Sequence, residues 1–191
     1  MIDFNSIIER FYTAGTPLHE VLMVHSRQVA DLSLELCKLL NGRGVTVDEE
    51  FVYAAAMLHD IGIIKVDAPR IHCQGNEPYI KHGIMGAEML ESMGLKEYAL
   101  VCERHTGAGL TLDDIKSQDL PLPLRDMTPQ SIEEKVVCYA DKFFSKTHLG
   151  DPARDIDTVR KQMARFGEKS LARFDEMHAL LCGCEPQPRH T

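Results

Sequence analysis

The 191-residue sequence lacks any long apolar run and any excess of basic residues. No stretch approaches the roughly eighteen apolar residues of a membrane-spanning helix, and residues 1–17 lack the basic start and apolar run of a secretory signal. We therefore expect a cytoplasmic protein with no membrane segment. The net charge of −8 argues against binding to a nucleic acid polymer, because recognition of a phosphate backbone needs a basic face. It still permits a small phosphorylated substrate, since a few local cations or a metal ion can dominate one pocket.

The six cysteines do not suggest a disulfide framework. Four of them are scattered singly in mostly apolar surroundings and are expected to be small buried residues in a reducing compartment: Cys37, Cys73, Cys102 and Cys138. Cys182 and Cys184 could bind a metal or form a disulfide, but one such pair near a polar tail is weak evidence, so we assign it no role.

Sustained strand-like alternation is also missing, as are internal repeats and low-complexity segments. Apolar residues instead recur at helical spacing, which predicts a single all-α domain with one sizeable core. The expected helices cover residues 17–40, 48–60, 80–93, 95–105, about 131–146 and about 155–182, with an ordered loop at 63–79, a connector at 110–127 and a disordered tail at 183–191. The last helix could cover the core or form the seam of a homodimer.

Polar residues occupy the apolar faces of these expected helices. His25 fills a gap in the apolar stripe of the first helix, at the position where another apolar residue is expected. His59, His82 and His105 each share a helical face with apolar residues of their own segment, and Asp141 does the same on the fifth helix. We therefore expect all five side chains to point into the core.

Each of these residues taken alone has an ordinary explanation, because a buried histidine can donate to a backbone carbonyl and Asp60 can cap the loop that follows it. Four histidines and two aspartates in one core would nevertheless cost more free energy than a small domain can spare, unless they satisfied one another. A metal centre resolves this, because imidazoles and carboxylates bind the ion that supplies the positive charge. The other histidines lack such placement: His19, His148, His178 and His190 are expected at the surface or in the tail, and His72 is left open.

The ordered set of these residues, with His59-Asp60-Ile61-Gly62 and a later Tyr-Ala-Asp-Lys that ends at Lys142, resembles the HDIG-type form of the HD-domain metal-dependent phosphohydrolase superfamily. The resemblance covers about residues 18–148. It implies five core helices around a metal centre, with additional helices appended. It also implies two ions: the first is held by His25, His59, Asp60 and Asp141, and Asp60 bridges to a second ion held by His82 and His105.

Mixed histidine and carboxylate ligation suits iron, manganese, zinc, cobalt or nickel better than calcium. Two such ions about 3.5–4 Å apart would hold a bridging water as a hydroxide nucleophile, and Asp60 could orient it. The sequence has no Gly-x-Ser-x-Gly element or comparable side-chain nucleophile. The expected activity is therefore hydrolysis of a phosphate ester or anhydride bond.

The resemblance implies a nucleotide or another small phosphorylated metabolite as the substrate, and symmetric dinucleoside polyphosphates are one specific candidate. Ile63 stands where the cyclic-dinucleotide branch places a lysine, and the Gly-Tyr-Pro element of that branch is absent, which counts against it. Six cations are the candidates for binding substrate phosphates. Arg104, Lys142 and Lys146 are preferred because each lies within about a turn of an expected ligand, and Lys65, Arg70 and Lys81 belong to the loop region.

Two other functions compete with hydrolysis. Some relatives of this type hold a di-iron centre that activates oxygen, which would require iron and a site open to an organic substrate. The second alternative is a non-catalytic, metal-bearing module that binds a nucleotide and regulates a partner. A purely structural metal is least expected, because structural zinc sites are usually closed and rich in cysteine.

Overall fold

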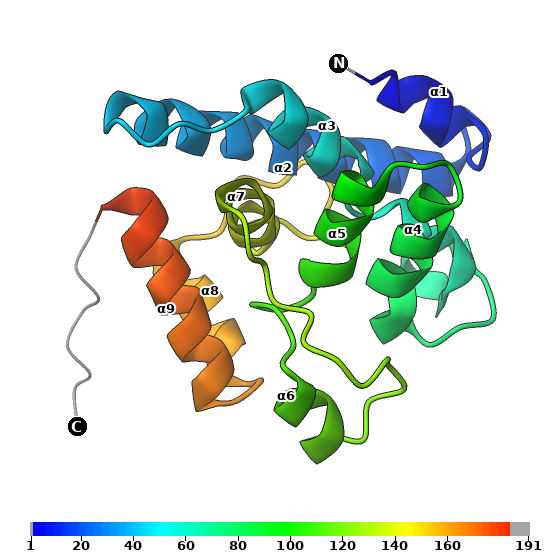
Figure 1. The fold of residues 1–191 in the computed structure, drawn as a ribbon. Helices are drawn as coiled ribbons and strands as arrows, with labels where there is room; N and C mark the ends of the chain where they lie inside the picture. Colours follow the sequence, from blue (N-terminus) through cyan, green and yellow to red (C-terminus); the bar gives the residue numbers. More distant parts are fainter. Residues whose placement is uncertain (1, 184–191) are drawn as a thin grey trace.

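The computed structural model describes residues 2–183, which form a helical assembly with one very short sheet (Figure 1). The expected all-α fold is confirmed. The α-helices are α1 (Phe4–Glu9), α2 (Pro17–Gly42), α3 (Glu49–Leu58), α4 (His82–Glu91), α5 (Lys96–Arg104), α6 (Leu112–Ser117), α7 (Ile132–Asp141), α8 (Ile156–Ala164) and α9 (Glu168–Cys182). None of the helices in this described range is long and apolar enough to cross a membrane.

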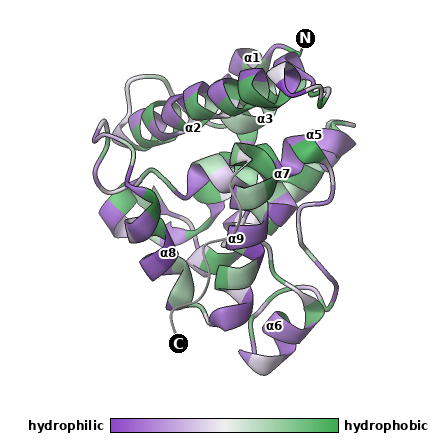
Figure 2. Ribbon diagram, turned by 90° about the vertical axis from the view of Figure 1, so that its left-hand side faces the viewer, coloured by the Kyte–Doolittle hydropathy of each residue, from purple (hydrophilic) through white to green (hydrophobic). Residues whose placement is uncertain are grey.

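The long helix α2 runs along one side of the molecule and begins as its sequence indicates. Thr16 is the N-cap and accepts a hydrogen bond from the backbone N–H of His19, and Pro17 occupies the first turn, where a missing N–H has no cost. Figure 2 shows hydrophobic and hydrophilic residues alternating along α2, as expected for a helix with one buried side. The apolar spacing of Leu18, Leu22, Val29, Leu32, Leu36 and Leu39 predicts that Leu39 is buried, which is wrong. Leu39 is 45% exposed and Leu40 is buried instead, because a 3.6-residue repeat drifts from a strict seven-residue spacing.

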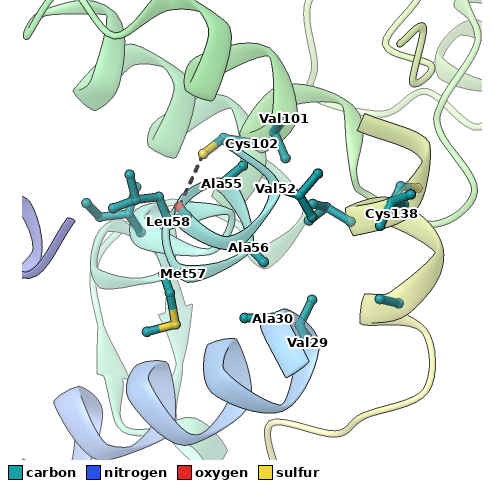
Figure 3. Close-up of a cluster of buried hydrophobic side chains, with 14 of the residues drawn as sticks. Val29, Ala30, Val52, Ala55, Ala56, Met57, Leu58, Val101, Cys102 and Cys138 are labelled. Carbon is teal, nitrogen blue, oxygen red and sulfur yellow. Dashed lines mark hydrogen bonds between the residues drawn. The ribbon is translucent and has the colours of Figure 1, made fainter. Parts of the chain in front are cut away.

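The core forms where α3 packs between α2, α5 and α7 (Figure 3). Ala55 and Ala56 of α3 and Ala30 of α2 are fully or almost fully buried, and their small side chains let the helices approach closely. Cys102 of α5 is also buried, and its thiol donates to the carbonyl of Leu58 at 3.3 Å. These contacts fix the C-terminal end of α3, from which the next residues of the chain enter the site.

The segment expected to be an ordered loop, residues 63–79, contains more regular structure than anticipated. It contains the short 3₁₀ helix η2 (Pro69–Ile71) and the strands β1 (Asp67–Ala68) and β2 (Cys73–Gln74), and its ends overlap two further 3₁₀ helices, η1 (Ile61–Lys65) and η3 (Tyr79–Lys81). The strands pair antiparallel, with Asp67 opposite Gln74 and Ala68 opposite Cys73. This two-residue pairing is too short to give a sequence pattern.

The single C-terminal helix expected at 155–182 is wrong, because α8 and α9 are separate and pack against each other. Gly167 breaks the helix with φ +105°, a backbone conformation that favours glycine. Helical spacing with Val159 and Met163 predicts that Phe166 is on the buried side of such a helix, but Phe166 is 57% exposed at the break. The connector at 110–127 contains α6, and the fifth helix ends at Asp141 rather than near residue 146. Of the expected tail, Gly183 forms the C-cap of α9, whereas residues 184–191, including Cys184 and His190, lie outside the described residues.

Candidate metal centre

Five elements each bring one part of the predicted ligand set to the same buried point. His25 lies in the middle of α2, His59 and Asp60 follow the last residue of α3, and His82 is the first residue of α4. His105 follows the last residue of α5, and Asp141 is the last residue of α7. All six residues are at most 8% exposed. The structure therefore brings together every residue that the sequence predicted as a ligand.

The first group of potential ligand atoms comprises His25, His59, Asp60 and Asp141, whose atoms lie within 4.8 Å of one another. His25 Nε2 is 2.9 Å from Asp141 Oδ1 and 3.2 Å from Asp60 Oδ2. His59 Nε2 is also 3.2 Å from Asp60 Oδ2. Two imidazoles and two carboxylates thus converge on one small volume.

The second group comprises Asp60, His82 and His105. The Nε2 atoms of both histidines lie 3.5 Å from Asp60 Oδ1, and they are 3.0 Å from each other. Asp60 therefore directs Oδ2 to the first group and Oδ1 to the second. This sharing explains why His59 and Asp60 are adjacent in the sequence. His59 belongs to the first group only, whereas Asp60 belongs to both groups.

Three histidines are oriented by the carbonyl three residues earlier in the chain. The Nδ1 atoms of His59, His82 and His105 lie 2.6, 2.8 and 2.7 Å from the carbonyl oxygens of Ala56, Tyr79 and Cys102, respectively. A carbonyl can only accept, so each Nδ1 carries a proton and each Nε2 is the ring nitrogen that faces the centre. This arrangement is typical of metal-binding histidines.

Glycines allow the backbone of α4 to approach the other elements of the site. A Cβ atom on Gly62 would lie 2.1 Å from the carbonyl oxygen of His82 and 2.3 Å from the backbone nitrogen of Gly86. A Cβ atom on Gly83 would lie 2.5 Å from the carbonyl oxygen of Cys102 in α5. Without these glycines, the second group of ligands could not be so compact.

The carboxylates of the centre are ionised and compensated by two lysines. Lys146 Nζ is 2.7 Å from Asp60 Oδ2, and Lys142 Nζ is 2.6 Å from Asp141 Oδ2. Burial alone would raise the pKa of both aspartates, but the nearby lysines and histidines hold each pKa well below its usual range. The two aspartates therefore remain anionic near neutral pH.

The histidines divide between two electrostatic environments. Burial lowers the pKa of His82 to about 3 and also lowers that of His105, so both imidazoles are neutral at physiological pH. For His59, burial is outweighed by Asp60 and Asp141, which raise its pKa to about 9. Neutral imidazoles and ionised carboxylates are the forms that bind a cation, so His59 would release its second proton when a metal binds.

Unsatisfied buried atoms show that the set fits a divalent metal. Among the described residues, both carboxylate oxygens of Asp60 and Nε2 of His59 are buried and form no hydrogen bond of acceptable geometry. Polar atoms buried without a partner are costly, and a cation in each ligand group would satisfy the Asp60 oxygen that is directed to that group. The buried His/Asp cluster is therefore suited to a divalent metal site, and its nitrogen and oxygen donors suit a transition metal.

A cavity of about 670 Å³ opens above this cluster and is lined in part by His82, His105 and Asp141. Of the six predicted phosphate-binding cations, Arg70, Lys142 and Lys146 line it. The lining does not include Arg104, Lys65 or Lys81.

The three predicted cations outside the lining have other surroundings. Arg104 NH1 bonds both carboxylate oxygens of Glu134, at 3.1 and 3.0 Å, and Lys81 pairs with Glu77 at 2.7 Å. Lys65 is exposed. The cavity lining therefore gives no support to their predicted role.

Two arginines that line the cavity, Arg154 and Arg173, were not selected from the sequence. Both follow residue 148, beyond the stretch that carries the resemblance, so nearness to a ligand in the sequence gave no reason to choose them. The only sequence feature that could have identified these two arginines is their positive charge in an otherwise amphipathic C-terminal region.

The remaining described histidines lie away from the six-residue cluster. His72 and His148 are exposed, and His19 is half-buried. His178, expected at the surface, is also half-buried, and its Nδ1 lies 2.6 Å from the hydroxyl of Tyr139. The separation of ligand candidates from other histidines thus follows the sequence analysis, apart from the partial burial of His19 and His178.

Comparison with known proteins adds a family and several relatives. The HD domain family model matches residues 22–145. An uncharacterized protein of Methanocaldococcus jannaschii, MJ0778, is 35% identical over 170 residues, which cover 85% of this chain and 90% of that protein.

Two further relatives are named tRNA (cytidine(56)-2'-O)-methyltransferase. The one from Picrophilus torridus is 31% identical over 73% of this chain and 37% of its own length. The one from Thermoplasma volcanium is 27% identical over 95% of this chain and 48% of its own length. The chain thus spans less than half of each methyltransferase. No solved structure matches significantly.

Proposed function

The chain belongs to the HD-domain family, and from this premise we propose that it is a metal-dependent phosphohydrolase. It cleaves an ester or anhydride bond in a nucleotide or another small phosphorylated metabolite. One observation carries the proposal: two groups of potential metal ligands share Asp60 beneath a cavity that is lined by cations. A shared carboxylate between two cation sites is the arrangement used for phosphate displacement by paired ions.

Divalent ions held by these residues would lower the pKa of a water molecule towards neutrality and offset the charge of the phosphate. The chain itself supplies the fixed orientation, since Asp60 and Asp141 are buried and ionised and three histidines are locked by backbone carbonyls. The carboxylate oxygens and imidazole nitrogens are thus already held in place before a metal or a substrate binds, which limits the reorganisation that the reaction requires.

Two lysines complete the electrostatic part of the site. Lys142 is held by the carbonyl oxygen of His105 at 2.9 Å and by Asp141, so its ammonium group is fixed at the edge of the cavity. Lys146 contacts Asp60, and its side chain is 13% exposed and lines the cavity. Both ammonium groups therefore lie beside the volume where a phosphate would bind.

The rest of the cavity favours a substrate with an apolar or aromatic portion. Ile80, Leu110, Leu120 and Phe144 contribute to its walls. An inorganic phosphate alone would leave this surface without a partner, whereas a nucleoside would cover it. These walls support a nucleotide or a similar phosphorylated metabolite over a simple phosphate.

Methyl transfer is not proposed for this chain, although two relatives carry that name. The chain corresponds to less than half of each methyltransferase. The alignment with the Thermoplasma volcanium protein covers 95% of this chain, so the shared part includes the HD segment. We therefore propose that the common part is the metal-bearing module.

The proposal is tested by hydrolysis assays on nucleotides, dinucleoside polyphosphates and small phosphate esters. The protein is purified anaerobically and loaded with manganese or iron. Turnover is expected for one substrate class and should be abolished in Asp60→Asn, with loss of bound metal. Asp67→Asn is the matched control, because Asp67 is an exposed carboxylate on β1. Absence of turnover by fully loaded wild-type protein would contradict the proposal.

A further inference from the structure

Most cations that line the cavity already have an acidic partner. Arg173, for example, also donates to the carbonyl oxygen of Gly109 at 3.0 Å, so it is held on two sides. The paired cations and their carboxylates are Arg173 with Asp114 at 2.7 Å, Lys142 with Asp141 at 2.6 Å and Lys146 with Asp60 at 2.7 Å. These pairs leave part of each positive charge compensated before any ligand arrives.

Arg154 differs from these cations. It is half-buried in the cavity wall, and its guanidinium donates to the neutral amide oxygen of Gln162 at 3.1 Å. Among residues 2–183, no carboxylate forms an ion pair with it. The adjacent carboxylate, Asp155, is used as the N-cap of α8 and accepts from the N–H and hydroxyl of Thr158 at 2.7 and 2.9 Å. Arg154 therefore keeps most of its five N–H donors for a ligand.

The backbone of Arg154 is fixed close to the metal-ligand segment. Its N–H donates to the carbonyl oxygen of Phe143 at 2.9 Å, and Phe143 follows Asp141 by two residues. The hydrogen bond attaches Arg154 to the end of α7 that carries a predicted ligand. Gln162 also lines the cavity, so the amide that orients the guanidinium is part of the same wall.

We propose that Arg154, oriented by Gln162, binds a phosphate group of the substrate. This inference rests on the proposed phosphohydrolase function and identifies a positioning residue within it. A guanidinium has the planar fork that matches two phosphate oxygens, and without a competing carboxylate it loses no ion pair on binding. Arg154 holds the substrate without taking part in bond cleavage, so its loss affects binding more than turnover.

The test uses manganese-loaded protein and methylenediphosphonate, an analogue of pyrophosphate that cannot be hydrolysed. Calorimetry measures its affinity for wild type, Arg154→Met, Arg154→Lys and Arg165→Met. Arg165 is an exposed arginine at the C-terminal end of α8 and lies outside the cavity lining, so Arg165→Met removes one positive charge at a place away from the cavity. Thermal unfolding of each variant shows whether the fold is retained.

We expect Arg154→Met to weaken binding about tenfold or more, Arg154→Lys to weaken it less, and Arg165→Met to leave it unchanged. With any hydrolysed substrate, Arg154→Met should raise KM with little change in kcat. Equal affinity in wild type and Arg154→Met, equal weakening in Arg165→Met, or no binding by wild type would each overturn the proposal. A normal Arg154 effect on binding in a protein that hydrolyses nothing would instead refute the phosphohydrolase function alone.

Discussion

Replacing Gly62 with alanine tests how the HDIG turn builds the metal centre. Gly62 lies in η1, and its place against α4 leaves no room for a side chain. An added Cβ would be 2.1 Å from the carbonyl oxygen of His82, whereas real Cβ contacts are essentially never shorter than 3.0 Å. The backbone of η1 or α4 must therefore retreat by about 1 Å, since the interior is close-packed.

The size of the effect follows from what is displaced. Overpacking a core typically costs about 1–3 kcal/mol, and here both obstructing atoms, the carbonyl oxygen of His82 and the nitrogen of Gly86, belong to the backbone. We expect destabilisation of about 3 kcal/mol, which for a domain of this size lowers Tm by about 6–12 °C. Because metal–ligand distances tolerate only about 0.2 Å, the shift of His82 relative to Asp60 should also cost metal affinity.

Thermal unfolding and metal content would be measured for Gly62→Ala and for Gly42→Ala. Gly42 is the last residue of α2, and a Cβ there would meet nothing within 4 Å, so its variant should be as stable as wild type or more so. If Gly62→Ala melted within about 2 °C of wild type and kept its full metal content, the steric argument would be refuted.

Two other substitutions test supporting contacts. Tyr12→Phe should cost about 2 kcal/mol in urea unfolding, because the buried Tyr12 hydroxyl donates to the carbonyl of Ile61 at 2.6 Å and accepts from the N–H of Ile64 at 3.1 Å. The control is Tyr98→Phe, because Tyr98 is a partly buried tyrosine of α5, and this change should leave stability nearly unchanged. An equal loss of unfolding free energy in both variants would contradict the role of the Tyr12 hydroxyl. Asp114→Asn should cost about 1 kcal/mol of unfolding free energy at pH 7. Burial alone would raise the pKa of Asp114, but hydrogen bonds from Thr111 and the charge of Arg173 lower it below 3.8. That stabilisation is present above the unfolded pKa and lost as the pH falls through the folded pKa, so a difference from wild type that persisted unchanged at pH 2 would contradict it.

Helical periodicity was sufficient to place five of the six predicted ligands on buried faces, and the resemblance to the HDIG pattern added Asp60. The structure brings all six together. Periodicity failed at Gly167, since apolar residues continue at helical spacing on both sides of the break between α8 and α9. It also could not reveal that Arg104 pairs with Glu134, thirty residues away, or that Arg154 reaches the cavity from a later segment. Partners that are distant in the chain depend on packing, which a local pattern does not encode.

The position of each histidine within its helix explains how its imidazole is oriented. The last carbonyls of an α-helix have no backbone donor, and His59 and His105 use such carbonyls, of Ala56 and Cys102, at the ends of α3 and α5. One hydrogen bond thus both satisfies the helix end and fixes the tautomer. His25 lies within α2, where the carbonyls are already paired, and its buried Nδ1 has no partner among the described residues. Its orientation depends instead on the aspartates at its Nε2, so it is the histidine whose position is set most directly by the charged centre itself.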